Sequence, residues 1–144
     1  MENNSRRSFL KDTCKICLLG ATTFSITEFL MSCGTTAKSF KTTVTDNKIE
    51  VPLSLFDTSN SQIISPRNYA YEIAVQKNTD NTFQALLLRC THQNNQLIPT
   101  GSGYYCSLHG SQYDKQGHVK KGPAEKGLPH LTIETTPTNL IIHI

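Results

Sequence analysis

Two short segments in the second half of the chain combine the residue types that bind transition metals. The first is Cys90-Thr91-His92 and the second is Cys106-Ser107-Leu108-His109, with thirteen residues between the two motifs. Their thiols and imidazoles can converge only if the two segments form facing loops. Soft thiolates together with borderline imidazoles select an iron–sulfur cluster or zinc, and they exclude calcium and magnesium, which prefer oxygen ligands.

The order of the ligands along the chain distinguishes these two metals. Structural zinc sites with two cysteines and two histidines usually pair like ligands, with the cysteines in one segment and the histidines in another. Here each segment supplies one ligand of each type. A cluster of two irons explains this mixed order better than one zinc ion does, and a zinc-stabilised binding module is the less favoured alternative.

With the residues that follow them, the two segments resemble the cluster-binding loops of the Rieske [2Fe–2S] family. The similarity continues through Gly117-His118-Val119 and Gly122-Pro123-Ala124, which resemble a strand and a proline-containing loop of that family. It covers residues 48–144. The resemblance implies an all-β fold of stacked antiparallel sheets, with the cluster-binding subdomain at one tip.

The resemblance also implies a role for each ligand. Cys90 and Cys106 are expected to bind the inner iron of one [2Fe–2S] cluster, and His92 and His109 the outer iron, close to solvent. Histidine in place of cysteine on one iron raises the reduction potential far above that of plant-type ferredoxins.

Four further positions place the chain between the subclasses of this family. Ser111 and Tyr113 match two hydroxyl donors that, in quinol-oxidising subunits, bond a bridging sulfide and a ligand cysteine. Asn95 and Leu108 stand where those subunits have two additional cysteines joined by a disulfide. We therefore expect hydroxyl donors without the disulfide, and an intermediate to high potential.

The segments around these loops alternate between apolar and polar residues as half-buried strands do. The stretch 83–88 is almost continuously apolar, which is typical of a strand buried on both faces. A turn over 135–139 predicts a hairpin at the C-terminal end. No stretch after Lys48 shows convincing helical periodicity. We therefore predict a compact all-β sandwich or barrel, with strands over 49–53, 69–75, 83–88, 131–134 and 140–142.

The first 33 residues have the features of an export signal. Arg6 and Arg7 begin a motif that resembles the twin-arginine signal, and a moderately apolar stretch follows it. Residues 30–33 resemble a bacterial lipobox, which predicts lipidation at Cys33. The Thr-, Ser- and Lys-rich segment 34–47 is interpreted as a tether. These features predict export across the bacterial inner membrane to the periplasm or cell envelope, with a lipid anchor.

Charge excludes one class of function. The whole chain carries 14 basic and 11 acidic side chains, a net charge of +3. Such a small surplus, with only Lys120 and Lys121 adjacent in the second half, does not provide the clustered basic face of a nucleic-acid-binding protein. At 144 residues the chain has the size of one domain, which excludes an enzyme with separate cofactor and substrate domains.

Together these observations predict an exported, membrane-anchored carrier of single electrons that exchanges them with a redox partner protein. The partner is a quinol-oxidising complex, a cytochrome or the large subunit of an oxidoreductase. The alternative is that the chain is itself the iron–sulfur subunit of a larger oxidoreductase, either quinol-oxidising or similar to arsenite oxidase. In neither case is it expected to be a stand-alone enzyme.

Overall fold

The computed structural model describes residues 39–144, and their regular structure consists of twelve strands and one short 3-10 helix, η1 (Leu53–Phe56). The prediction of an all-β fold is therefore confirmed. Within this range no helix is long and apolar enough to cross a membrane. The expected export signal over 1–33, with Cys33, lies outside the described residues.

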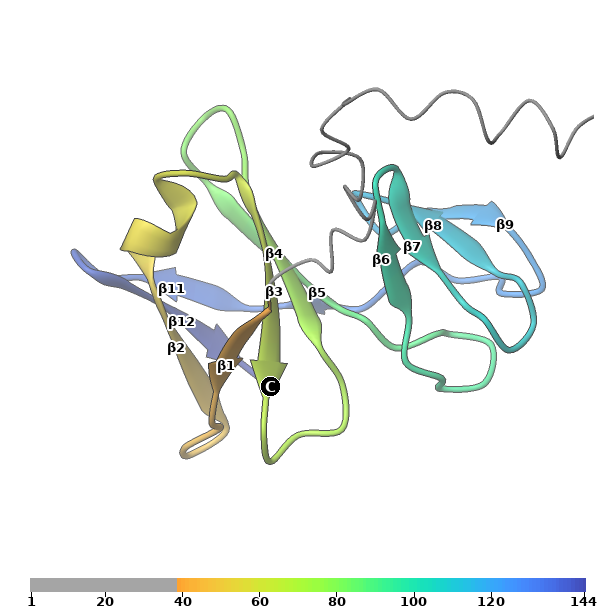
Figure 1. Ribbon diagram of the computed structural model, residues 1–144, viewed down its shortest axis with the longest axis horizontal. Helices are drawn as coiled ribbons and strands as arrows, with labels where there is room; N and C mark the ends of the chain where they lie inside the picture. Colours follow the sequence, from red (N-terminus) through yellow and green to blue (C-terminus); the bar gives the residue numbers. More distant parts are fainter. Residues whose placement is uncertain (1–38) are drawn as a thin grey trace, which may run out of the picture. The chain divides into compact units, whose positions relative to one another are not determined.

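Two sheets form the larger part of the fold, which we call the base (Figure 1). A five-stranded sheet has the order β1-β3-β4-β5-β10, in which β1 runs parallel to β3 and the other neighbours are antiparallel. A three-stranded antiparallel sheet has the order β11-β12-β2. The strands of the base are β1 (Phe40–Thr42), β2 (Lys48–Pro52), β3 (Ser61–Pro66), β4 (Ile73–Lys77), β5 (Phe83–Leu87), β10 (His130–Leu131), β11 (Ile133–Thr135) and β12 (Asn139–His143).

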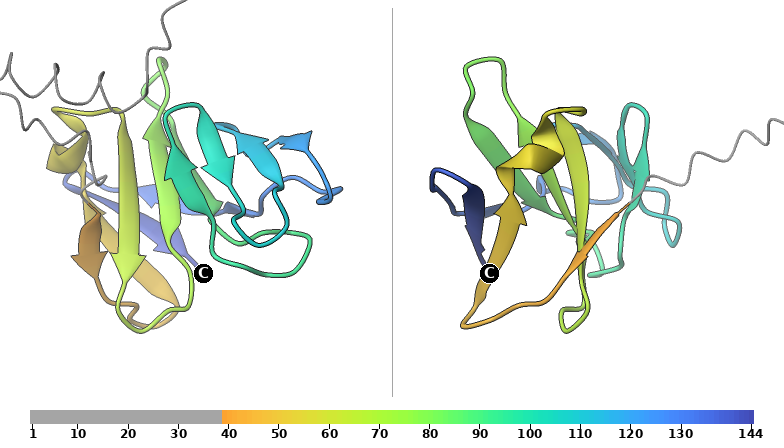
Figure 2. Two further views of the ribbon diagram at one scale, coloured as in Figure 1. Left: turned by 45° about the vertical axis from the view of Figure 1, so that its right-hand side comes forward. Right: turned by 60° about the vertical axis from the view of Figure 1, so that its left-hand side comes forward.

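The two sheets of the base face each other across a hydrophobic core, as the turned views of Figure 2 show. Alternate residues of β2 and β12 point inward, so Ile49, Val51, Leu140 and Ile142 are fully buried. This alternation is the pattern that the sequence shows, because successive side chains of a strand point to opposite faces. The inward residues of the five-stranded sheet complete the core with Ile64, Ile73, Val75, Ala85 and Leu87.

Between β5 and β10 the chain forms a separate four-stranded antiparallel sheet, which we call the tip together with its loops (residues 88–128). Its order is β6-β7-β8-β9, and its strands are β6 (Ile98–Thr100), β7 (Gly103–Tyr105), β8 (Gln112–Asp114) and β9 (Val119–Lys121). Its inner face packs on the base through a second core that contains Leu86, Leu88, Leu97, Tyr104 and Tyr113, together with Ile63 and Ala74.

Strand β5 belongs to both cores. Ala85 and Leu87 face the core between the two sheets of the base, whereas Leu86 faces the core of the tip. This sharing explains why 83–88 is apolar on both faces, and it confirms the interpretation of that segment as a doubly buried strand. It also means that β5, from which the first loop of the tip leaves, is anchored in the base core on one face and in the tip core on the other.

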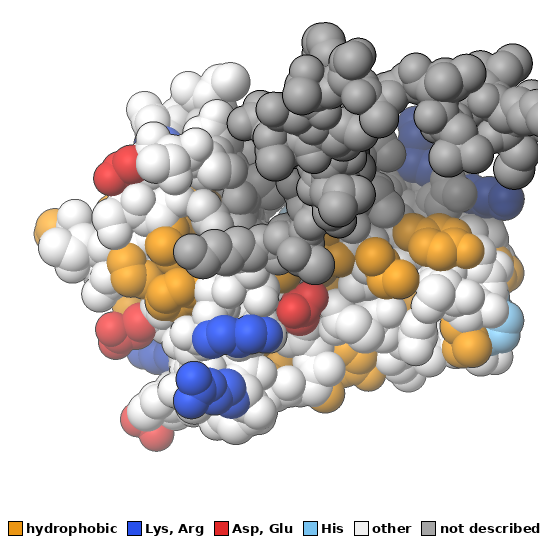
Figure 3. Space-filling model, viewed as in Figure 1, with side chains coloured by type: hydrophobic (Ala, Val, Ile, Leu, Met, Phe, Trp, Pro, Cys, Tyr) orange, Lys and Arg blue, Asp and Glu red, His pale blue; other side chains and the backbone are white. Residues whose placement is uncertain are grey.

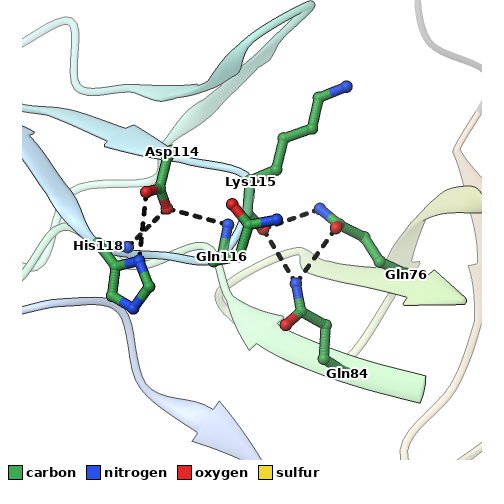
Figure 4. A network of polar contacts seen from close by, with 6 residues as sticks. All are labelled: Gln76, Gln84, Asp114, Lys115, Gln116 and His118. Atoms are coloured by element: carbon green, nitrogen blue, oxygen red, sulfur yellow. Dashed lines mark hydrogen bonds and ion pairs between the residues drawn. The ribbon is translucent and has the colours of Figure 1, made fainter. Parts of the chain in front are cut away.

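Two glutamines join the base to the tip (Figure 4). The side-chain amide of Gln76, on β4, donates to the Tyr104 hydroxyl at 3.0 Å and to the Lys115 carbonyl at 2.9 Å. Gln84, on β5, donates to the same carbonyl at 3.0 Å. In the same turn Asp114 accepts hydrogen bonds from the backbone N–H groups of Gln116 and His118. These contacts hold the β8–β9 turn against the base.

Three boundaries differ from those expected. The strand expected over 131–134 is divided between β10 and β11, which belong to different sheets. The other two differences arise from contacts with distant segments. Part of the expected tether is folded, because β1 pairs with β3, and Phe40 and Val44 pack against the base core. Strand β4 begins at Ile73 rather than at residue 69, because Tyr71 leaves the strand pattern and donates its hydroxyl to the Asn94 carbonyl at 2.8 Å. In both cases a contact with a distant segment, which local pattern does not contain, sets the boundary.

Candidate metal centre

The first loop of the site connects β5 to β6 and contains Cys90 and His92. Its backbone closes on Cys90, whose N–H donates to the Asn95 carbonyl at 2.8 Å and whose carbonyl accepts from the Asn94 N–H at 2.8 Å. Asn94 has a φ of 52°, in the left-handed region that asparagine tolerates better than most residues do. The loop therefore turns sharply at Asn94, two residues after the histidine.

The second loop connects β7 to β8 and repeats this geometry around Cys106. The Cys106 N–H donates to the Ser111 carbonyl at 2.9 Å, and its carbonyl accepts from the Gly110 N–H at 2.9 Å. Gly110 has a φ of 80°, which glycine adopts without steric cost. In each loop the fourth residue after the cysteine thus makes the turn, and the carbonyl of the fifth residue accepts a hydrogen bond from the cysteine N–H.

The two loops bring the four expected ligands together. The rings of His92 and His109 have centroids 5.1 Å apart and are perpendicular. Cys90 and Cys106 are free cysteines with exposed fractions of 1% and 0%, whereas both histidines are exposed. The site therefore has two layers, with sulfur against the core of the tip and imidazole at the surface.

The surroundings of Cys90 favour its thiolate, the form that binds metal. Burial alone raises the pKa of the Cys90 thiol. Hydrogen bonds from the Tyr113 hydroxyl, from the backbone N–H groups of His92 and Gln93, and with the Cys106 thiol outweigh burial, and the pKa lies below its usual value. The residues present thus fit a metal group that needs a buried thiolate.

The geometry also bears on the number of metal ions. Among residues 39–144, no three His, Cys, Asp or Glu side chains converge as the ligands of a single ion. Two buried thiols in one layer and two exposed imidazoles in the other suit a group with two metal ions, each held by two protein ligands.

Tyr113 makes three contacts around the first loop. Its hydroxyl oxygen is 3.5 Å from Cys90 Sγ and 3.0 Å from Thr91 Oγ1, and it accepts a hydrogen bond from the Thr91 N–H at 3.2 Å. Burial raises the pKa of Tyr113, so the phenol keeps its proton and serves as a donor at neutral pH. The structure thus places the expected tyrosine beside the expected cysteine.

Ser111 is fully buried, and its hydroxyl accepts a hydrogen bond from the Ala124 N–H at 3.0 Å. The N–H uses a lone pair of the oxygen and leaves the hydroxyl proton available to another acceptor. The contact ties the second loop to the proline-containing segment 122–128. The Thr91 hydroxyl ties the first loop to the same segment by donating to the Lys126 carbonyl at 2.6 Å.

Two features of the site were not anticipated from the sequence. The side-chain amide of Asn95 lies 3.9 Å from Cys106 Sγ, and Thr91 competes for the Tyr113 hydroxyl. The residue types alone give no signal of either contact, because both depend on how the loops face each other. Leu108 is 57% exposed beside the histidines and makes no comparable contact among the described residues.

Comparison with known proteins places this chain in a family. The Rieske [2Fe-2S] domain profile matches residues 44–132. The mitochondrial Rieske subunit of the cytochrome b-c1 complex from Aotus azarae is 43% identical over 58 residues, which are 37% of this chain and 20% of that protein. The ubiquinol-cytochrome c reductase iron-sulfur subunit of Rickettsia typhi is 34% identical over 84 residues, covering 53% of this chain and 45% of that protein. The chain thus spans less than half the length of either curated relative.

Solved structures confirm the fold. The cyanobacterial plasma membrane Rieske protein PetC3 from Synechocystis PCC 6803 superposes with a TM-score of 0.54 at 20% identity, over 67% of this chain and 99% of that one. Naphthalene 1,2-dioxygenase superposes with a TM-score of 0.52 at 18% identity, over 67% of this chain and 26% of the enzyme. The profile match covers well over half of the 144 residues, so this chain belongs to the Rieske [2Fe–2S] family, whose domain implies one [2Fe–2S] cluster.

Proposed function

We propose that this protein is an exported, membrane-anchored electron carrier whose [2Fe–2S] cluster is held by Cys90, His92, Cys106 and His109. The observation that carries the proposal is the pair of equivalent loops, which place two buried thiols beneath two exposed imidazoles. Cys90 and Cys106 would bind the inner iron, and His92 and His109 the outer iron. When bound, such a cluster supplies one-electron transfer at a raised potential.

The layering of the site determines where electrons enter and leave. The cysteine sulfurs are shielded by the core of the tip, whereas the exposed imidazoles of His92 and His109 reach solvent. A partner that approaches the histidine face comes closer to the metal than one that approaches from any other side. We therefore assign electron exchange to this face and expect a redox module rather than a stand-alone enzyme.

Charge favours a partner with an acidic surface. The tip carries five basic and two acidic side chains, whereas the base, within residues 39–144, carries four basic and six acidic ones. On the face drawn in Figure 3, acidic side chains lie over the left and centre with Lys and Arg side chains among them, and at the upper right Lys and Arg side chains lie without acidic neighbours. Because opposite charges steer encounter, an acidic partner would meet the tip first.

The second candidate is that the protein works as a fixed subunit of a quinol-oxidising oxidoreductase. The curated relatives favour it, since they are named as subunits of the cytochrome b-c1 complex and of ubiquinol-cytochrome c reductase. Purification of the full chain from its native membrane separates the two proposals. A free carrier elutes at the size of one chain, whereas a subunit copurifies with larger proteins.

Cluster binding is tested by metal analysis and spectroscopy of the full chain. We expect two irons per chain, visible absorption, and a paramagnetic resonance signal on reduction. Cys106→Ala should abolish all three, whereas His118→Ala, which changes an exposed histidine in the β8–β9 turn, should preserve them. A colourless protein with one zinc ion per chain would instead establish the zinc-stabilised binding module.

Export and anchoring are tested separately from the cluster. We propose that Arg6 and Arg7 direct export through the twin-arginine route and that Cys33 carries the lipid. Lysine at both arginine positions should leave the protein in the cytoplasm, and Cys33→Ala should release it from the membrane in cell fractionation. Undiminished export of the double-lysine variant would reject the twin-arginine proposal without affecting the assignment of the cluster.

A further inference from the structure

We propose that the side-chain amide of Asn95 is a hydrogen-bond donor to the sulfur of Cys106 and raises the reduction potential of the site. In this role Asn95 serves Cys106 as the Tyr113 hydroxyl serves Cys90, so that each ligand sulfur receives one side-chain donor. The inference rests on the proposed assignment of Cys106 as a cluster ligand. It makes Asn95 a positioning and tuning residue.

The neighbours of Asn95 fix which end of its amide faces the sulfur. Asn95 Nδ2 lies 3.1 Å from the Gln96 carbonyl oxygen and 3.9 Å from Cys106 Sγ. A carbonyl oxygen only accepts hydrogen bonds, so the atom beside it must be the NH₂ nitrogen rather than Oδ1. That nitrogen has two hydrogens, and the second is free for the sulfur.

The backbone around Asn95 holds this side chain in place. The Asn95 carbonyl accepts the Cys90 N–H at 2.8 Å, so the residue is fixed to the first loop while its amide reaches the second. Next to it, the Gln96 side chain accepts the Glu72 N–H of the base at 3.0 Å. Asn95 therefore links the two ligand loops from an anchored position.

Comparison of the two loops shows that this contact is specific to the first. Asn95 and Ser111 occupy equivalent places, each the fifth residue after its cysteine and each returning its carbonyl to that cysteine. The Ser111 hydroxyl accepts the Ala124 N–H of the segment 122–128, which lies outside both loops. The longer Asn95 side chain crosses to the opposite sulfur instead.

The direction of the effect follows from electrostatics. Cys106 has an exposed fraction of 0%, so water cannot supply a donor to its sulfur and the Asn95 amide is not replaced when removed. A donor withdraws electron density from a thiolate, and it stabilises the reduced, more negative state more than the oxidised one. Loss of the amide should therefore lower the midpoint potential.

The test compares Asn95→Leu, which keeps the size but removes the N–H, with Gln116→Leu, which removes an exposed amide from the β8–β9 turn of the tip. We expect Asn95→Leu to shift the equilibrium with a redox dye about tenfold toward the oxidised protein, which is about 59 mV for one electron. Gln116→Leu should not shift it. In resonance Raman spectra, the iron–cysteine stretching bands should lose part of their sensitivity to deuterated solvent in Asn95→Leu only.

A second variant keeps the test decisive if Asn95→Leu loads poorly. Asn95→Asp keeps the shape and replaces the donor by a carboxylate, so it should lower the midpoint further. An unchanged midpoint in a fully loaded Asn95 variant overturns the inference and leaves the proposed function intact. Failure of both variants to load, with the fold preserved by circular dichroism, also overturns it, because Asn95 would then only brace the loops. Failure of the unaltered protein to bind iron would instead reject the proposed function.

Discussion

The Tyr113 hydroxyl has two competing acceptors, and this competition makes a prediction in which two neighbouring substitutions have opposite signs. The Thr91 hydroxyl has one hydrogen, which it donates to the Lys126 carbonyl at 2.6 Å. Towards Tyr113 it can therefore only accept. The single hydrogen of the Tyr113 hydroxyl is thus shared between Thr91 Oγ1 at 3.0 Å and Cys90 Sγ at 3.5 Å.

Removal of the Tyr113 hydroxyl and removal of its rival acceptor, the Thr91 hydroxyl, should shift the midpoint potential in opposite directions. Tyr113→Phe deletes the donor and should lower the midpoint by about 50–100 mV, because a hydrogen bond to a charged acceptor contributes roughly 1.5–3 kcal/mol and only the difference between redox states counts. Thr91→Val deletes the rival acceptor, so the hydrogen of the Tyr113 hydroxyl is donated to Cys90 Sγ alone. A neutral hydrogen bond contributes about 0.5–1 kcal/mol, so Thr91→Val should raise the midpoint by about 20–40 mV.

Redox titration followed by paramagnetic resonance measures both shifts, with Thr91→Ser as the control that keeps the hydroxyl. The double variant Thr91→Val/Tyr113→Phe should match Tyr113→Phe alone, because Thr91 acts only through the tyrosine. A lower or unchanged midpoint in Thr91→Val would refute the competition. A rise that persists in the double variant would show that Thr91 acts by another route.

Three further substitutions test the surface, the turn and the core. Lys126→Glu at the tip should slow oxidation of the reduced protein by ferricyanide, an anion, in stopped-flow measurements at low salt. Lys48→Glu on the base should slow it much less, and equal slowing would contradict the assignment of electron exchange to the tip. Burial raises the pKa of Asp114, but hydrogen bonds from the His118 backbone and side chain, the His118 charge and a further backbone N–H outweigh burial and lower the pKa below its usual value. The stability that the Asp114 carboxylate adds is therefore present above about pH 4 and is lost as pH falls through the folded-state pKa. The melting-temperature advantage over Asp114→Asn should therefore shrink below about pH 4, and an advantage that is constant with pH would reject this role. Leu88→Ala, at an exposed fraction of 0%, should lower the free energy of unfolding in urea by about 2–5 kcal/mol, and a change below about 1 kcal/mol would show that the tip core repacks around it.

Part of the fold could be predicted from the sequence because the segments that contain β2 and β4 alternate between apolar and polar residues. Strand β3 and the four short strands of the tip could not be predicted from such a pattern. The apolar run over 83–88 gave β5 and its burial on both faces, and the turn after residue 134 gave the last hairpin. Strand β1 could not be predicted, because its Thr-, Ser- and Lys-rich surroundings resemble a linker. It forms through parallel pairing with β3, which is a distant partner.

The candidate site shows the same division. Residue type and spacing predicted the two loops and four candidate ligands, because metal chemistry restricts which side chains can serve, and the structure brings these four side chains to one end of the tip. Where a polar side chain points is set by loop geometry instead. From the sequence, Asn95 was notable only because it stands where quinol-oxidising subunits have a cysteine. The structure of the first loop shows that the Asn95 amide reaches Cys106. Likewise, nothing in the sequence indicates that Thr91 and Tyr113 share one hydrogen.

The position of the tip within the chain has a consequence for assembly. Residues 88–128 are one continuous insertion, and its two ends are neighbours because β5 pairs with β10 and the Leu87 N–H donates to the Pro129 carbonyl at 3.0 Å. Pairing within the base therefore holds both ends of the insertion in register. A substitution confined to the exposed surface of the ligand loops leaves this pairing intact, whereas a substitution in the core that the tip shares with Ile63, Ala74 and Leu86 affects the tip and the base together.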